Sequence, residues 1–66
     1  MGTIGERIKA ALADRHQTQA TLAQAVGLSE SAMSKALAGK RSLSSIEAAL
    51  IAEHLGVTMH WLVTGE

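Results

Sequence analysis

Four polar residues near the middle of the chain have the spacing that places side chains together on one helix face. They are Glu30, Ser31, Ser34 and Lys35, at positions i, i+1, i+4 and i+5. In a DNA major groove, lysine donates to guanine, serine bonds to either strand, and glutamate accepts from cytosine. The alternative is a merely solvated face. It applies most to Glu30, whose charge repels phosphate and favours a helix N-terminus.

The elements that position this face are two short helices joined by a tight turn. One is expected over about residues 19–26 behind the cap Thr18, and the next starts after the cap Ser29. Gly27 provides the positive φ of the turn, and Gly39 ends the second helix. The residues expected to fill the angle between the helices are Leu22, Val26, Leu28 and Met33. The small Ala23 allows a close crossing, and Ala36 and Leu37 complete the inner face of the second helix. This is the pattern of a helix-turn-helix, which projects its second helix from the body.

Three further helices are predicted around this pair. Thr3–Glu6 and Ser44–Glu47 have the form of capping boxes, and Thr58 caps a short last helix. Gly5 is expected to weaken the first turn by somewhat under about 1 kcal/mol. The apolar residues that recur along the first helix are Ile4, Ile8, Ala11 and Leu12. The fourth helix is expected to carry Ala48, Ile51, Ala52 and Leu55 inward, and the short last helix holds Trp61 and Leu62. We therefore expect an all-α, five-helix bundle that forms one domain over residues 1–66.

Charge is divided unevenly along this neutral chain. Residues 1–45 hold all six Lys and Arg residues against three acids (+3), and residues 46–66 hold three acids and no Lys or Arg (−3). The basic front predicts contacts to the DNA backbone. The candidate phosphate-binding residues are Gln19, Ser29, Lys40 and Arg41. For Gln19 the alternative is an ordinary exposed helix residue, and for Lys40-Arg41 it is a solvated loop.

Several other classes of protein are disfavoured. The three histidines lack ligand spacing, no cysteine is present, and Gly39-Lys40-Arg41 lacks the other residues of a P-loop. No general base is expected beside Ser31, Ser34 or Ser44. We therefore expect no enzyme, no metal and no cofactor. No apolar run approaches the roughly 18 residues of a membrane span, and the N-terminus has no secretory pattern. A cytoplasmic location is expected.

The chain resembles the Cro/C1-type (XRE) helix-turn-helix family over residues 4–65. The resemblance rests on Thr18-Gln19, Leu22-Ala23, Val26-Gly27, Ser29, Gly39-Lys40-Arg41, Ala52-Glu53-His54-Leu55-Gly56-Val57 and Trp61-Leu62-Val63-Thr64-Gly65. It implies a lambda-repressor-like fold whose third helix reads double-stranded DNA for a transcriptional regulator, typically a repressor. It also implies phosphate binding by Gln19 and base contacts by Glu30, Ser31 and Lys35. Glu30 stands where many members have Gln, and Ala36 and Ala38 replace larger side chains.

Surplus apolar residues near the C-terminus predict a contact surface. Ile46, Leu50, Trp61 and Val63 exceed what one inward stripe needs, so they either form a homodimer interface or close the underside of the bundle. The rival to DNA binding is a protein-interaction or antitoxin-type module with this fold. Residues 33–41 resemble a subgroup associated with ImmA/IrrE-type zinc peptidases. That resemblance suggests the N-terminal part of a longer regulator, with a C-terminal effector domain or a separate peptidase partner.

Overall fold

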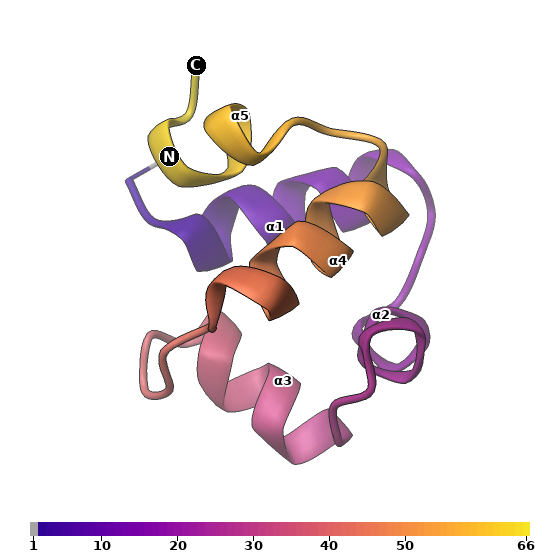
Figure 1. The fold of residues 1–66 in the computed structure, drawn as a ribbon. Helices are drawn as coiled ribbons and strands as arrows, with labels where there is room; N and C mark the ends of the chain where they lie inside the picture. The colour runs from indigo at the N-terminus through magenta and orange to yellow at the C-terminus, as the bar shows by residue number, and fades with distance from the viewer. Residues whose placement is uncertain (1) are drawn as a thin grey trace.

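The computed structural model describes residues 2–66, and within them the backbone forms five α-helices and no strand (Figure 1). The helices are α1 (Ile4–Asp14), α2 (Gln19–Val26), α3 (Glu30–Leu37), α4 (Ser45–Leu55) and α5 (Met59–Thr64). The expected all-α bundle is confirmed. In residues 2–66, none of the helices has the length and apolar content that crossing a bilayer requires.

Side-chain caps fix where each helix begins. The hydroxyl oxygens of the N-cap residues accept a hydrogen bond from the backbone N–H three residues later; these caps are Thr3, Thr18, Ser29, Ser44 and Thr58. Both predicted capping boxes form, with Glu6 and Glu47 returning the bond. Gly27 and Gly56 end α2 and α4 in the left-handed conformation. Local chemistry therefore sets the helix boundaries.

The core is formed by one face of each helix. The largest fully buried side chains are Ile8, Leu22, Met33, Ile51, Leu55 and Leu62. Every residue predicted to point inward is buried or half-buried. α2 packs against α3 and α4, and α1 packs against α3 and α5. Figure 1 shows α3 at the lower edge of the molecule, with α5 and the C-terminus at the opposite edge.

Gly5 has a packing role that its low helix propensity concealed. A Cβ atom at this position would lie 2.0 Å from the carbonyl oxygen of Leu37. The first turn of α1 therefore touches the backbone at the end of α3, and only glycine allows this approach. Helix propensity alone did not indicate this close crossing, which sets the position of α3.

Arg7 is the second unpredicted contact, because a charged residue lies inside the fold. Its side chain is only 6% exposed. Nε donates to the carbonyl oxygen of Leu62 and Nη2 to that of Val63, both at 2.8 Å. These carbonyls lie in the last turn of α5, where a cation is favourable. One cation of the predicted basic front therefore attaches α5 to α1.

Candidate nucleic-acid interface

The outward face of α3 brings together the four predicted base-reading residues. Glu30, Ser31, Ser34 and Lys35 are all exposed. The opposite face of the helix is buried through Met33, Ala36 and Leu37. The Ser29 hydroxyl accepts from the backbone N–H of Ala32 at 3.0 Å and so fixes the start of the helix. One fixed face of α3 therefore presents donors and acceptors to solvent.

The corner between α2 and α3 holds this face away from the body. Gly27 has a φ of 79°, and the N–H of Leu28 donates to the carbonyl of Ala23 at 2.9 Å, which closes the end of α2. Gln19, the first residue of α2, is exposed just after the cap Thr18. The first amides of a helix point outward along its axis and favour anions. Gln19 therefore lies at a helix N-terminus, where anions are favoured.

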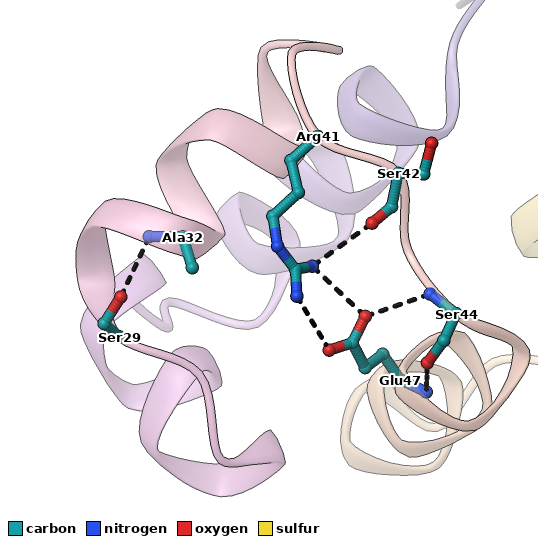
Figure 2. A network of polar contacts seen from close by, with 6 residues as sticks. All are labelled: Ser29, Ala32, Arg41, Ser42, Ser44 and Glu47. Atoms are coloured by element: carbon teal, nitrogen blue, oxygen red, sulfur yellow. Dashed lines mark hydrogen bonds and ion pairs between the residues drawn. The ribbon is translucent and has the colours of Figure 1, made fainter.

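The connection from α3 to α4 contains the two predicted loop cations, and they differ. Lys40 is exposed, whereas the Arg41 side chain is 35% exposed. Figure 2 shows the Arg41 guanidinium between the Ser42 carbonyl and the Glu47 carboxylate. Arg41 donates from Nη1 to Ser42 at 3.2 Å, and from Nη1 and Nη2 to the two Glu47 oxygens at 3.1 and 3.0 Å. Arg41 is therefore held in place, unlike a solvated loop cation.

Both members of the ion pair between Arg41 and Glu47 are charged at neutral pH. The hydrogen bond from Arg41, then the backbone N–H of Ser44, lowers the pKa of Glu47 to about 2. The same contact raises the pKa of Arg41. At the other capping box, bonds from the backbone and hydroxyl of Thr3 lower the pKa of Glu6. The pair therefore adds no net charge to this side of the domain.

The chain is similar in sequence to known helix-turn-helix proteins. Residues 8–62 match the helix-turn-helix family. The chain belongs to the Cro/C1-type helix-turn-helix family. It is 39% identical to the HTH-type transcriptional regulators for conjugative elements R391 of Providencia rettgeri and SXT of Vibrio cholerae. Each match covers the whole chain, which spans 30% of the length of these regulators.

A solved structure gives an independent comparison of the fold. The crystal structure of the P22 c2 repressor in complex with synthetic operator 9T superposes with a TM-score of 0.90, covering all of both chains. The sequences are 24% identical, so the likeness concerns the fold. The expected lambda-repressor-like architecture of the helix-turn-helix domain is thereby confirmed.

The predicted dimer residues of the helix-turn-helix domain divide into two kinds. Ile46, Leu50 and Val63 are 72%, 39% and 57% exposed. Trp61 is half-buried and packs against the core. Sequence reasoning missed Met59, which is 38% exposed on α5. Four large apolar side chains on α4 and α5 are therefore exposed to solvent and are not required to fill the core.

Two further features of the domain bear on other chemistry. A groove of about 520 Å³ lies between α1 and α5, with Ala10, Val57 and Trp61 in its lining and Asp14 and Arg15 at α1. Within residues 2–66, no group of three His, Asp or Glu side chains is placed to hold a metal ion.

Lys9, which the sequence did not single out, lines a second groove against the end of α3. Lys9 lies beside Ala38 and Gly39 because α1 crosses α3, and the sequence alone does not show this crossing.

Proposed function

We propose that this domain binds double-stranded DNA sequence-specifically, for a transcriptional regulator, by placing α3 in the major groove. The observation that carries the proposal is the division of α3 into a fully buried face and a face of four exposed polar side chains. A polar helix face alone is common in proteins. Here it lies on α3, the second helix of the helix-turn-helix, which projects from the body and suits base readout. The names of the R391 and SXT regulators support this proposal.

The proposed contacts divide between bases and phosphates. Lys35, Ser31 and Ser34 contact base edges, and Glu30 accepts from cytosine or orders the N-terminus of α3. Gln19, Ser29, Lys40 and Arg41 hold phosphates on either side of this helix. The Ser29 oxygen already accepts a hydrogen bond from the backbone N–H of Ala32. The hydroxyl hydrogen remains available to donate to a phosphate oxygen. Repression then follows from occupying a promoter, a consequence that rests on analogy with the family.

Selection from randomised duplex DNA tests the proposal, with binding of the enriched sequence followed by fluorescence anisotropy. Lys35→Ala is expected to weaken binding by roughly 5- to 150-fold and to relax specificity at one base pair. Arg15→Ala removes the same charge in the groove between α1 and α5, and serves as the matched control. Equal losses in the two variants, or no enrichment at low salt, would contradict base readout by α3.

A homodimer is part of the proposal, because Ile46, Leu50 and Val63 expose apolar surface on α4 and α5. Two-fold pairing would place two copies of α3 about 34 Å apart, one turn of DNA. The enriched sequence should then be a palindrome with half-sites about ten base pairs apart. Ile46→Asp should convert a dimer to a monomer in sedimentation equilibrium, while Ala49→Asp, at another exposed position of α4, should not.

The second candidate is a protein-interaction or antitoxin-type module with weak DNA binding. The observation in its favour is that Arg7 and Arg41 are engaged within the fold, which reduces the free positive charge of a neutral chain. In that case Trp61→Ala should abolish binding to a protein partner, while Lys35→Ala and Gln19→Ala change nothing. Comparing these three variants in one pull-down and one DNA-binding assay separates the candidates.

The chain matches only part of each conjugative-element regulator. The chain spans 30% of the length of the conjugative-element regulators. By analogy with the family, we propose an effector domain joined to this unit and action in the cytoplasm. A separate ImmA/IrrE-type peptidase is the alternative partner. Incubation with such a peptidase and Zn²⁺, followed by mass spectrometry, would show cleavage if the regulator is its substrate.

A further inference from the structure

Glu47 connects the first turn of α4 to the loop that follows α3. Its Oε1 accepts from the backbone N–H of Ser44 at 2.9 Å, and the Ser44 hydroxyl accepts from the N–H of Glu47 at 3.1 Å. This reciprocal cap fixes the carboxylate relative to α4. The same carboxylate takes two parallel hydrogen bonds from Arg41 (Figure 2). The position of the guanidinium is therefore set by α4 and not by the loop alone.

The hydrogen-bond donors of Arg41 show what is left for a ligand. A guanidinium has five N–H donors in a rigid plane. Both N–H groups of Nη1 are used, by Ser42 and Glu47, and one N–H of Nη2 is used by Glu47. The remaining N–H of Nη2 and that of Nε lie parallel along one edge. Neither has a partner among residues 2–66, and the side chain is 35% exposed.

We infer that Glu47 is a positioning residue for phosphate recognition: by binding the Nη1–Nη2 edge of Arg41, it presents the Nε–Nη2 edge to a backbone phosphate of DNA. Two parallel N–H donors match two phosphate oxygens. Arginine loses much rotamer freedom when it is held, and Glu47 has already ordered it. Lys40, the residue directly before Arg41, would contact a phosphate as a mobile point charge. The inference rests on the DNA-binding function proposed above.

The variant Glu47→Gln gives a test in which two effects have opposite signs. Glutamine retains the capping oxygen, so α4 keeps its start, but it offers Arg41 one uncharged acceptor in place of two charged ones. Loss of a negative charge near DNA should by itself strengthen binding. We expect the reverse, a weakening of at least about threefold, because the bidentate edge is no longer held. Glu53→Gln removes the same charge from an exposed position of α4 and should not weaken binding.

A double-mutant cycle shows whether Glu47 acts through Arg41. Arg41→Ala should weaken binding of the selected duplex about tenfold. In the Arg41→Ala background, Glu47→Gln should cause no further loss. Arg41→Lys keeps the charge but has no bidentate edge, so it should also bind weakly while retaining the salt dependence of the wild type. A Glu47→Gln variant that binds as tightly as the wild type, or loses affinity equally in the Arg41→Ala background, overturns the inference.

The Arg41 side chain provides a direct second readout by NMR. Adding the selected duplex should shift the Nε–H resonance of Arg41 in the wild type and leave it unshifted in Glu47→Gln. Melting temperatures measured in parallel separate this effect from unfolding. If the wild type binds no duplex, the DNA-binding function itself fails, and this role of Glu47 fails with it. If the wild type binds and the resonance shifts equally in both proteins, only the role of Glu47 fails.

Discussion

Replacing Gly5 with alanine should destabilise the domain, although the same exchange stabilises most helices. Alanine gains up to about 1 kcal/mol over glycine inside a helix. At this position, however, the new Cβ would lie 2.0 Å from the carbonyl oxygen and 2.8 Å from the carbonyl carbon of Leu37. Ordinary contacts begin near 3.4 Å, so α1 and α3 must separate by about 1.4 Å. Both atoms belong to the backbone, and no side-chain rotation can relieve the overlap.

The loss of stability is the cost of the overlap with Leu37 minus the gain in helix propensity. Forcing extra volume into a packed contact costs about 1–3 kcal/mol or more, and here it opposes a gain of under about 1 kcal/mol. A net loss of about 2 kcal/mol lowers the melting temperature of a domain this small by about 8–16 °C. The separation also displaces α3, so affinity for the selected duplex should fall as well.

Thermal unfolding followed by circular dichroism measures this loss. Gly2→Ala is the matched control, because a Cβ there would meet nothing nearer than Glu6 Oε1 at 3.8 Å. Ala13→Gly, at an exposed position of α1, calibrates helix propensity and should cost about 1 kcal/mol. A Gly5→Ala protein that melts at or above the wild-type temperature would refute the argument from close packing.

Three further predictions concern Arg7, Glu47 and salt. Arg7→Met should cost about 2–4 kcal/mol and increase the exposure of Trp61 to solvent, because α5 loses its link to α1; an unchanged melting temperature and tryptophan spectrum would contradict this. The pKa of Glu47 is about 2 in the folded domain against an ordinary 4.5, so the unfolded state takes up the proton first. This stabilisation is complete above about pH 5 and is lost as the pH falls toward 2. Melts at pH 7, 5 and 3 should thus depend less on pH in Glu47→Gln than in Glu53→Gln. The logarithm of DNA affinity against that of salt should have a slope near −4 to −5 for about four to six cationic contacts per dimer; a slope steeper than about −8 would reveal another basic surface.

The fold could be predicted from the sequence because its signals are local. A cap such as Thr18 acts within three residues, and a glycine such as Gly27 ends its helix regardless of what packs against it. The inward faces follow from helical periodicity, since the buried residues of each short helix recur on one face. The exposed face of α3 was predicted by the same argument, as what remains when the buried stripe is removed. The roles of its residues on DNA stay predictions.

The missed contacts join segments that are distant in sequence. Arg7 and Leu62 lie 55 positions apart, and no local rule connects a cation in α1 with the carbonyls of α5. A signal was nevertheless present: Arg7 stands three residues after Ile4 and four before Ala11, on the apolar stripe of α1. A charge on such a stripe requires a buried partner. Gly5 gave a similar signal, because a glycine within a helical pattern often has a packing reason.

These internal contacts also change what the charge distribution implies. Of the six Lys and Arg residues, all within the part of the chain that the structure describes, Arg7 is buried and Arg41 is paired with Glu47. Only Lys35 and Lys40 are exposed on α3 and its following loop. Non-specific attraction to DNA scales with cations that contact phosphates, so it should be weak here. In the proposed function, specific binding then depends on directional hydrogen bonds from α3 and on a well-ordered Arg41. A low affinity for random DNA is therefore expected together with a high ratio of specific to non-specific binding.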